Sequence, residues 1–557
     1  MYCVLAGLSA GAQHTAKGEL GMVASSSALA SEAGVEVMKR GGNAVDAACA
    51  TALALAVTHP SAGNLGGGGF MLIRMANGTA TAIDYRETAP ALASRNMYLD
   101  KDGRLVQDSS LVGYRASGVP GTVAGLALAQ AKYGKLKWRE VLDPACRLAE
   151  QGFKLSKSLA RGLRNTKPLS KFEESRRVFQ KGGEFYKEGD LFRQPDLAAT
   201  LRRIQTDGPK DFYSGRTAQL IASDQAEHGG LITLKDLAEY KAVERAPLIG
   251  RYRGHEIITM PPPSSGGIAL IEMLHILERY DLAALQSDEA RTDHLLVETM
   301  RRAFADRAEF AGDPDFVKVP TAGLTSEKYA SEVAATIDLD KATPSAVIGH
   351  GHPAMHESTQ TTHFSVVDAE GNAVSNTYTL NMGFGSGVTV KGAGFLLNNE
   401  MDDFAAKPGT PNGFGLIQGE ANAIAPNKRP LSSMTPTMVL KDGRLLLVTG
   451  SPGGPTIITT VLQTLVHVID HKMSLENAAG APRLHHQWMP DEIRAERSAM
   501  SPAVRARLEA MGHRFAAKPG LMGEAWGDLE SIALEPVTGL RVGVTDPRSP
   551  DAGAVGY

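Results

Sequence analysis

Gln360-Thr361-Thr362-His363-Phe364-Ser365-Val366-Val367-Asp368 stands past the middle of the chain, where a polar stretch rich in Gly and Pro gives way to a strand pattern. The loop-like composition begins near Thr343 and continues to Gln360. A cut before Thr361 would make Thr the first residue of a new chain, and the freed α-amine would stand beside the hydroxyl as a built-in base. The stretch therefore favours a self-cleaving enzyme with an N-terminal Thr nucleophile.

The residues after this point alternate like strands joined by tight turns. The pattern predicts a strand over 362–367, a turn over 368–372 and a returning strand over 373–380. Further strands are predicted on either side of Lys441-Asp442-Gly443, and a helix over 457–469 follows a Ser-Pro-Gly-Gly run. Strands and helices mixed in this way indicate a layered α/β or α+β fold.

The N-terminal side of the chain begins with two predicted helices. The first covers 27–40 and ends at a Gly-Gly pair, and the second covers 44–57 behind an Asn43 cap. The second helix is apolar nearly all round, which predicts that it is buried. Residues 115–340 are predicted to be mainly helical, with a strand near 256–259.

The composition is that of an ordinary globular chain. The 557 residues are 43% hydrophobic and 21% charged, and the net charge of −3 argues against capture of nucleic acid or of an anionic membrane. At roughly 150 residues per domain the length predicts three or four units, although interlocked α/β enzymes break this rule. Cys3, Cys49 and Cys146 have no CxxC partner, so we expect buried small side chains and neither a zinc site nor a disulfide framework.

The N-terminal segment carries mixed signals for export. A short apolar run at 4–8 precedes Ala10-Gly11-Ala12, an A-x-A pattern typical of a secretory signal, but no basic residue precedes the run. Residues 1–12 are therefore a candidate signal segment, and we expect a periplasmic or secreted protein, with the cytoplasm as the alternative. No stretch reaches the roughly 18 apolar residues of a membrane span, since the best candidate, 44–57, is too short and contains Asp46.

Three other patterns have simpler structural explanations. The Gly66–Gly69 run precedes a strand, whereas a dinucleotide loop links a strand to a helix, so close backbone packing is the better interpretation. Residues 154–187 are rich in Lys and Arg but are interrupted by Glu, which indicates a solvated helical face. His350, His352 and His356 could bind a metal, but a loop near a processing site explains them more simply.

Several blocks of the chain, in order, resemble the gamma-glutamyltransferases (gamma-glutamyltranspeptidases), which belong to the N-terminal-nucleophile hydrolases. The resemblance covers nearly the whole chain, and chance does not place so many specific motifs in the same order. The matching blocks are residues 64–70, 84–90, 361–368, 376–381, 397–404, 428–434 and 449–454.

This resemblance implies an α+β fold, the four-layer αββα sandwich of the N-terminal-nucleophile hydrolases. It also implies a precursor that cuts itself between Gln360 and Thr361 into two interlocked chains. Residues 13–360 would form the large subunit, and residues 361–557 would form the small subunit, whose N-terminal residue is the catalytic Thr.

Four residues match the catalytic positions of the family. Thr361 matches the nucleophile, and Thr379 matches the residue that hydrogen-bonds and orients it. Gly453 and Gly454 match the glycines whose backbone N–H groups form the oxyanion hole, where a lost donor typically costs on the order of 3 kcal/mol. Only Gly lets the backbone approach a substrate so closely.

Six residues match the family's clamp for the amino-acid end of the substrate. They are Arg86, Ser432 and Ser433 on the α-carboxylate side, and Asn381, Glu400 and Asp403 on the α-amino side. Arg can hold a carboxylate with two parallel charge-assisted bonds. A carboxylate at Asp403 selects for an ammonium, so it favours γ-glutamyl substrates over the glutaryl groups that related cephalosporin acylases handle.

Two further segments match the family with less consequence for the chemistry. Residues 408–420 match the lid loop, but Phe414 stands where Tyr is common, which weakens any expectation of a lid hydrogen bond and leaves room for broader acyl specificity. His485-His486-Gln487-Trp488 looks like a metal or acid–base site, but the family uses it for neither, and we interpret it as structural.

The activity implied is that of a gamma-glutamyltransferase and glutathione hydrolase without a metal or other cofactor. The γ-glutamyl group of glutathione or of another γ-glutamyl amide would pass through an ester on Thr361 to water, an amino acid or a dipeptide. The nearest alternative is a glutaryl-7-aminocephalosporanic acid (cephalosporin) acylase on the same scaffold. An inactive, self-cleaved binding protein for γ-glutamyl peptides and a metalloenzyme built on the His350 cluster are more distant.

Overall fold

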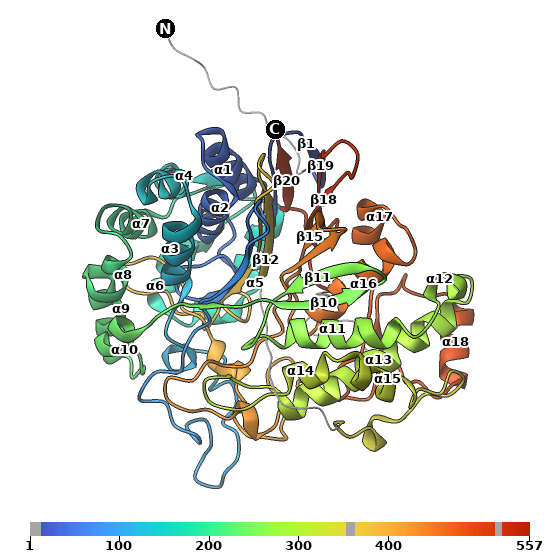
Figure 1. The fold of residues 1–557 in the computed structure, drawn as a ribbon. Helices are drawn as coiled ribbons and strands as arrows, with labels where there is room; N and C mark the ends of the chain where they lie inside the picture. The colour runs from blue at the N-terminus through green and yellow to red at the C-terminus, as the bar shows by residue number, and fades with distance from the viewer. Residues whose placement is uncertain (1–12, 352–361, 518–525) are drawn as a thin grey trace.

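Two seven-stranded sheets lie face to face at the centre of the molecule, in a computed structural model that describes residues 13–351, 362–517 and 526–557 (Figure 1). The first sheet has the order β1 (Thr15–Gly18), β19 (Arg541–Thr545), β18 (Glu530–Leu534), β15 (Arg444–Thr449), β14 (Thr437–Lys441), β11 (His255–Thr259) and β10 (Leu248–Tyr252). The second has the order β20 (Gly553–Gly556), β2 (Met22–Ser25), β12 (Thr362–Val367), β13 (Ala373–Thr379), β3 (Gly68–Arg74), β4 (Ala80–Asp84) and β9 (Val243–Arg245). Neighbouring strands in both sheets run antiparallel.

Apolar side chains from both sheets fill the space between them. Phe70 and Leu72 of the second sheet share one buried cluster with Met438 and Val448 of the first. Successive strand residues point to opposite faces, so each sheet also presents an outer face that needs cover.

A helical layer covers the outer face of each sheet (Figure 1). The layer on the second sheet contains α1 (Ala28–Lys39), α2 (Ala44–Thr58), α3 (Thr122–Tyr133), α4 (Trp138–Gln151), α7 (Pro195–Asp207), α8 (Lys210–Ser214), α9 (Arg216–Glu227) and α10 (Leu234–Glu239). The layer on the first contains α11 (Ser265–Leu277), α12 (Leu282–Leu285), α13 (Glu289–Phe310), α14 (Thr321–Leu324), α15 (Glu327–Ala334), α16 (Thr456–Ile469), α17 (Leu475–Gly480) and α18 (Pro502–Ala510). The predicted four-layer αββα sandwich is therefore confirmed.

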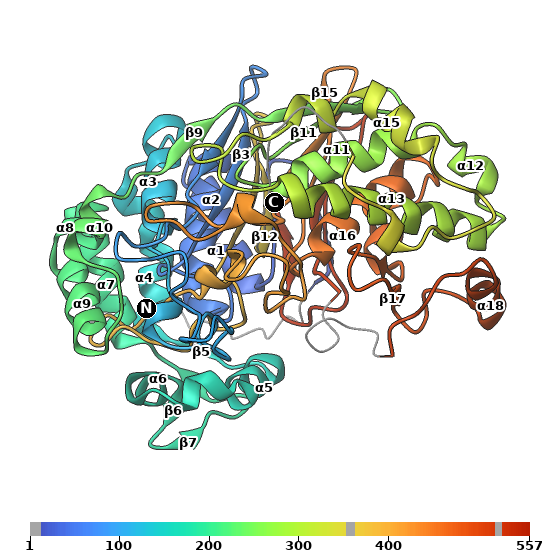
Figure 2. The same ribbon diagram turned by 90° about the horizontal axis from the view of Figure 1, so that it is seen from below.

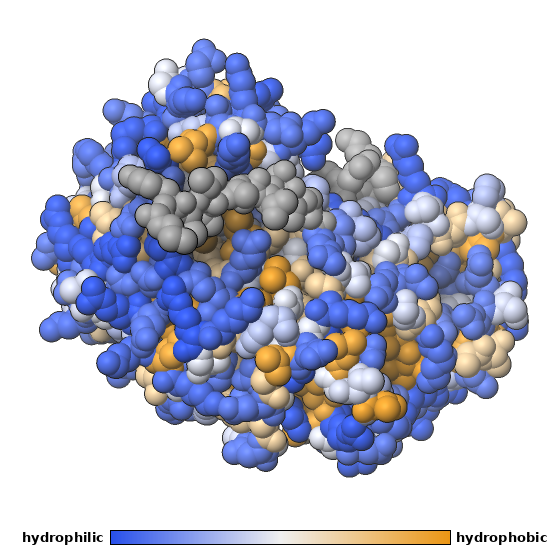
Figure 3. Space-filling view, turned by 90° about the horizontal axis from the view of Figure 1, so that it is seen from above, coloured by the Kyte–Doolittle hydropathy of each residue, from blue (hydrophilic) through white to orange (hydrophobic). Residues whose placement is uncertain are grey.

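A small lobe projects from this body (Figure 2). It contains α5 (Lys157–Asn165), α6 (Glu173–Phe179), β6 (Gln180–Lys181) and β7 (Glu184–Phe185), with β5 (Phe153–Lys154) pairing with β8 (Leu191–Phe192) beside it. Hydrophilic side chains dominate the face shown in Figure 3, with hydrophobic patches scattered among them. No helix within the described ranges is long and apolar enough to cross a membrane.

Helix α2 shows how local sequence sets this architecture. The Asn43 side chain accepts from the backbone N–H groups of Val45 and Asp46, and Asp46 accepts from the Asn43 N–H, so both ends of a capping box are in place. Every residue of α2 is buried, as its apolar composition predicts. Cys49 in α2 and Cys146 in α4 are free and buried, and Cys3 lies outside the described residues.

The second sheet interleaves strands from both sides of the expected cut. β12 lies between β2 and β13, and β13 in turn pairs with β3. A cut before residue 361 would leave these ladders of hydrogen bonds intact, so the two fragments would stay joined.

The prediction of mainly helix over 115–340 missed two strands of the central sheets. β9 and β10 are short, and each forms the edge of its sheet. Edge strands are commonly short and carry charged residues, so their apolar alternation is weak. The predicted strand near 256–259 is confirmed as β11.

Candidate functional site

Arg86 lies fully buried just beyond the end of β4, among three carboxylates. Its Nη2 atom donates to Asp403 Oδ2 at 2.6 Å, and its Nη1 atom is 2.7 Å from Glu400 Oε2 and 3.6 Å from Glu87 Oε2. These four side chains are at most 2% exposed. We call them the Arg86 cluster, a site in which buried carboxylates outnumber the cation they surround.

Burial and this excess of carboxylates change the acidity of the cluster. The pKa of Glu87 rises to about 8, chiefly because burial disfavours its charged form. Burial also raises the pKa of Glu400 and of Asp403, although Arg86 opposes both shifts. Burial lowers the pKa of Arg86, but the three carboxylates more than offset it, so that pKa is raised. Near neutral pH the guanidinium is therefore charged while at least one acid holds a proton.

The turn that carries Glu400 and Asp403, η4 (Glu400–Asp403), is tied to the N-terminal part of the chain. Asn398 Oδ1 accepts from the Glu400 N–H at 3.0 Å and from the Gly118 N–H at 2.8 Å. Asn399 Nδ2 donates to the Leu111 carbonyl at 2.8 Å. These bonds fix the turn against residues that lie 280 and 288 positions earlier in the chain.

The predicted carboxylate-side residues Ser432 and Ser433 follow a segment that contacts Arg86. The carbonyl oxygens of Pro430 and Leu431 accept from Arg86 Nε and Nη2, each at 3.4 Å. Both Ser side chains are buried. The structure therefore brings Arg86, Ser432 and Ser433 into one neighbourhood.

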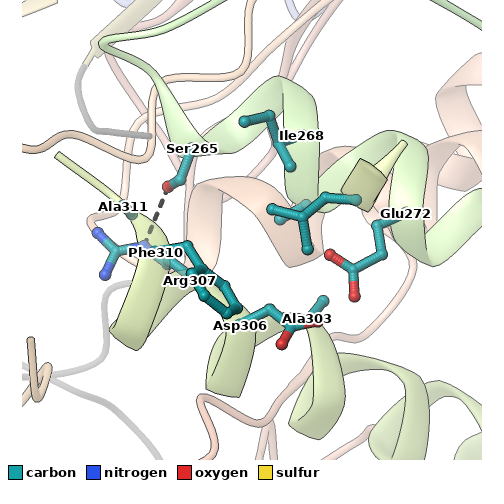
Figure 4. A pocket seen from close by; sticks show the side chains of 10 residues that line it. Ser265, Ile268, Glu272, Ala303, Asp306, Arg307, Phe310 and Ala311 are labelled. Atoms are coloured by element: carbon teal, nitrogen blue, oxygen red, sulfur yellow. Dashed lines mark hydrogen bonds between the residues drawn. The ribbon is translucent and has the colours of Figure 1, made fainter. Parts of the chain in front are cut away.

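A second buried cation, Arg307, lies behind this neighbourhood. Its Nε donates to Ser265 Oγ at 3.0 Å (Figure 4). Ser265 Oγ in turn donates to the Ser432 carbonyl at 3.0 Å. Burial lowers the pKa of Arg307 to about 10, with Asp403 opposing the shift. In the same pocket, Asp306 Oδ1 accepts from the Gly351 N–H at 2.7 Å, which anchors the last described residue before 362.

Thr379 and Asn381 stand where β13 ends. Thr379 Oγ1 accepts from the Asn381 N–H at 2.9 Å, and the Asn381 side chain donates to the Asn399 carbonyl at 3.0 Å. Asn381 adopts a φ of 75°, a conformation that Asn tolerates better than most residues. Because Asn399 directly precedes Glu400, these bonds connect Thr379 to the Arg86 cluster.

Gly453 and Gly454 form a turn just before α16. Their φ angles are 129° and 60°, which favour Gly. Within the described residues, neither backbone N–H donates to an acceptor. The turn lies at the N-terminal end of a 14-residue helix, where unpaired N–H groups and the helix dipole favour negative charge. This geometry can stabilise an oxyanion.

The glycine turn lies beside the strands that carry the other predicted residues. Ser375 Oγ of β13 donates to the Thr449 carbonyl of β15 at 3.0 Å. A Cβ added to Gly450 would lie 2.5 Å from the ring of His363 in β12, so these strands approach closely. The start of β12 thus pairs with the end of β13 and lies against Gly450, three residues before the glycine turn.

Some predicted residues lie outside the described part of the chain. These are Gln360, Thr361, His352 and His356. The described chain resumes at Thr362, whose backbone pairs with Tyr378 next to Thr379.

The His485-His486 pair is buried and enclosed by structural contacts. His485 lies 3.0 Å from Thr459 Oγ1 and 3.0 Å from Gln487 Oε1, and His486 lies 3.4 Å from Asp491. Burial lowers the pKa of His485 to about 3 and that of His486 to about 4. Neutral, enclosed imidazoles support the structural interpretation.

The one group of side chains in the described ranges that could together hold a metal lies elsewhere. It consists of Asp224, Glu227 and His228 at the end of α9, in the outer helical layer. None of the predicted site residues belongs to it.

Three residues near the site were not singled out from the sequence. Glu87 and Asp402 lie inside the matching blocks 84–90 and 397–404, so the family motifs could have indicated both as site residues. Arg307 carried no signal beyond its place in a helical pattern. Its place near the site depends on the packing of α13 against Ser265, 42 residues earlier in the chain.

Comparison with known proteins gives a consistent result. The sequence profile of the family described as "Gamma-glutamyltranspeptidase" matches residues 30–556. The chain is 52% identical to the glutathione hydrolase proenzyme of Escherichia coli (strain K12), over 98% of this chain and 93% of that protein. It is 45% identical to the glutathione hydrolase proenzyme of Pseudomonas sp. (strain A14), over 100% of this chain and 97% of that protein.

A solved structure shares the fold along the full length. The cephalosporin acylase from Bacillus halodurans superposes with a TM-score of 0.87 at 27% identity. The superposition covers 100% of this chain and 99% of that one.

Proposed function

Because this chain belongs to the gamma-glutamyltranspeptidase family, we propose that it is a glutathione hydrolase and gamma-glutamyltransferase made as a self-cleaving precursor. The family profile spans 30–556, and the glutathione hydrolase relatives match over nearly their whole length. The observation that carries the assignment to this chain is the Arg86 cluster, which offers a buried cation beside buried carboxylates. A γ-glutamyl donor ends in a free amino acid, whose carboxylate and ammonium match these two charges.

We propose that the precursor cuts itself between Gln360 and Thr361, giving a large subunit of 13–360 and a small subunit of 361–557. One peptide link, about 3.8 Å between Cα atoms, separates Thr361 from Thr362 at the start of β12. This end of the strand adjoins Thr379 and lies against Gly450, which precedes the glycine turn. Support for the cut therefore comes from the position of β12 as well as from the sequence motif.

In the proposed reaction Thr361 Oγ attacks the γ-carbonyl carbon, and the Thr361 α-amine takes the hydroxyl proton. The N–H groups of Gly453 and Gly454 stabilise the negative oxygen that develops. Collapse breaks the γ-amide bond, and the proton passes to the leaving amine, which for glutathione is cysteinylglycine. Thr379 orients the nucleophile through its hydroxyl.

The acyl-enzyme ester then passes its γ-glutamyl group to an acceptor. Water gives hydrolysis and free glutamate, whereas an amino acid or dipeptide gives transfer. Attack by either acceptor restores the Thr361 hydroxyl, so no cofactor is consumed.

Donor recognition exchanges one set of charge pairs for another. In the structure Arg86 pairs directly with Asp403 and Glu400. A bound γ-glutamyl group would place its α-carboxylate against Arg86 and the two serines 432 and 433. Its ammonium would then meet Asp403, Glu400 and the Asn381 carboxamide, so each buried charge keeps a partner.

A glutaryl or cephalosporin acylase activity is the second candidate, because the superposed Bacillus halodurans protein is a cephalosporin acylase. A glutaryl group lacks the ammonium and would leave Asp403 without its partner. Hydrolysis of γ-glutamyl-p-nitroanilide and glutaryl-p-nitroanilide separates the two. Leaving a buried charge unpaired costs about 3 kcal/mol, which corresponds to a ratio of rates of at least about 100-fold. We therefore expect the γ-glutamyl compound to be preferred by at least about 100-fold.

The direct test of the precursor is intact-mass analysis of the purified chain beside Thr361→Ala and Thr361→Ser variants. We expect two fragments that place the cut at Gln360-Thr361, and a single uncut chain for Thr361→Ala. The Ser variant keeps a hydroxyl and should still be cut. A cut that persists in Thr361→Ala would assign the nucleophile elsewhere.

We also propose that the protein is exported, on the basis of the A-x-A pattern in 1–12, a segment outside the described residues. Mass analysis of protein from periplasmic and cytoplasmic fractions tests this proposal. Export predicts that the large subunit in the periplasm begins near residue 13.

A further inference from the structure

Asp402 is a buried carboxylate that points away from the Arg86 cluster, although it is the neighbour of Asp403 in the chain. Its Oδ1 accepts from Ser110 Oγ at 2.7 Å, and its Oδ2 accepts from the Gly413 N–H at 2.9 Å. Its side chain is 4% exposed. One carboxylate therefore joins the substrate-binding turn, a loop of the large subunit and the loop 408–420.

The tip of the loop 408–420 is well ordered by its own hydrogen bonds. Asn412 Oδ1 accepts from the Phe414 and Leu416 N–H groups, each at 3.1 Å, and the Gly415 N–H donates to the Asn412 carbonyl at 2.9 Å. A carboxamide that caps its own loop in this way makes a compact turn. Asp402 therefore bonds, through the Gly413 N–H, to a compact turn with its own internal hydrogen bonds.

This tip carries Phe414 to the glycine turn. A Cβ added to Gly454 would lie 2.8 Å from the Phe414 ring, so the ring rests against the backbone of the turn. The backbone of the tip is also held, because Gln487 Nε2 lies 3.5 Å from the Phe414 carbonyl. The aromatic ring therefore packs against the glycine turn that would hold the oxyanion.

We propose that Asp402 is a positioning residue that latches the loop 408–420 to Ser110 and so holds Phe414 against the Gly453-Gly454 turn. This inference rests on the function proposed above. The latch would fix the loop that closes the donor site, so that its loss weakens donor binding more than it slows the chemical step.

The latch has chemical support in its charge and in its connections. Burial raises the pKa of Asp402 to about 6, with Ser110 opposing the shift, so near pH 7.5 the group is mainly a carboxylate. Hydrogen bonds to an ionised acceptor are roughly twice as strong as neutral ones. Ser110 lies before the proposed cut and Gly413 after it, so the latch would bridge the two subunits.

The test compares Asp402→Asn and Ser110→Ala with a matched control, Asp211→Asn. Asp211 is 3% exposed and also accepts from a backbone N–H, that of Arg216 at 3.1 Å, and from a hydroxyl, that of Thr217. It lies on α8 in the outer helical layer. Asp211 also lies 3.6 Å from Arg203 Nε, so the control removes a buried carboxylate with at least as many partners, in the outer helical layer.

Two measurements are made on the processed enzymes: kinetics with γ-glutamyl-p-nitroanilide, and deuterium exchange of peptides covering 408–420. We expect Asp402→Asn to raise KM about tenfold with kcat changed less than about threefold, because the Asn amide N–H₂ cannot accept from the second donor. Ser110→Ala should raise KM about threefold. Asp402→Asn and Ser110→Ala should both speed deuterium exchange in 408–420. Asp211→Asn should change neither KM nor the exchange rate. The double variant Asp402→Asn/Ser110→Ala should raise KM by less than the product of the two single increases.

The latch is overturned if Asp402→Asn matches Asp211→Asn in both KM and exchange. If Asp402→Asn does not fold or does not self-cleave, Ser110→Ala decides, since it leaves every buried charge in place. Failure of the wild-type protein to release p-nitroaniline would refute the proposed function instead, because the exchange measurement needs no turnover.

Discussion

Two buried ionic clusters in this molecule use the same kinds of side chain but balance their charges in opposite ways. In the first, on α13, Glu298 Oε2 accepts from Arg302 Nη1 at 2.6 Å, its Oε1 accepts from the Thr343 N–H at 3.1 Å, and Arg301 lies 3.3 Å away. We call this the Arg302 cluster. In the Arg86 cluster three carboxylates share one guanidinium, and neither oxygen of Glu87 accepts a hydrogen bond of good geometry from another described residue.

The acidities of the two clusters follow from this balance. Burial raises the pKa of Glu298, but Arg301 and Arg302 more than offset it, and the pKa ends below its usual value. The Glu87 carboxyl is as deeply buried, and its pKa rises to about 8. A cluster rich in donors stabilises the fold by itself, whereas a cluster rich in carboxylates gains from a cation that arrives with a ligand.

The largest effect should come from Arg86→Met. The substrate α-carboxylate loses its buried cation, so kcat/KM for γ-glutamyl-p-nitroanilide should fall by at least about 1,000-fold, or about 4 kcal/mol. The free energy of unfolding, measured in urea on the single-chain Thr361→Ala background, should fall by less than it does for Arg302→Met, because the acids of this cluster can take up protons. Equal losses of stability would remove the distinction between the clusters.

Arg302→Met should show the opposite balance of effects. Arg302 also donates from Nε to Thr336 Oγ1 at 2.8 Å and from Nη2 to the Thr336 carbonyl at 2.9 Å, so its removal leaves both Glu298 and the Thr336 carbonyl short of donors. We expect the free energy of unfolding to fall by about 3–5 kcal/mol. The enzyme that folds should keep kcat/KM within about threefold of wild type. A collapse of donor binding in this variant would show that the α13 cluster is also part of the site.

Local sequence predicted the elements whose signals are local. Asn43 before an apolar run predicted α2, and the alternation over 362–367 followed by the Asp368–Asn372 turn predicted the β12–β13 hairpin. Both signals depend on residues within a few positions of one another. The four-layer arrangement, in contrast, followed from the resemblance, because pairing β12 with both β2 and β13 joins distant parts of the chain.

The site was predicted as a set of residues but not as a set of contacts. The motifs assigned Arg86 to the α-carboxylate and Asp403 to the α-ammonium of the substrate, and in the structure the two side chains pair directly across 317 residues of sequence. Asp402 and Asp403 are adjacent in the chain but point to different partners. Which one faces the site is decided by Ser110 and Gly413, and no local pattern carries that information.

The smallest and most specific effect should be a change in the pH dependence of stability for Glu87→Gln. The folded-state pKa of Glu87 is raised to about 8, so its protonated form contributes stability that is complete below the unfolded pKa of about 4.3 and is lost as the pH rises toward 8. Gln keeps the shape and neutrality of the protonated acid, so the variant should gain on the order of 1–2 kcal/mol relative to wild type between pH 6 and pH 8.

Urea unfolding on the Thr361→Ala background measures this gain, and Glu298→Gln is the control. Because the folded pKa of Glu298 is lowered, its contribution is lost only as the pH falls through that value, and Glu298→Gln should show no comparable gain between pH 6 and pH 8. A parallel pH profile for wild type and Glu87→Gln would mean that Glu87 is ionised throughout this range, and that Arg86 balances more negative charge than the structure implies.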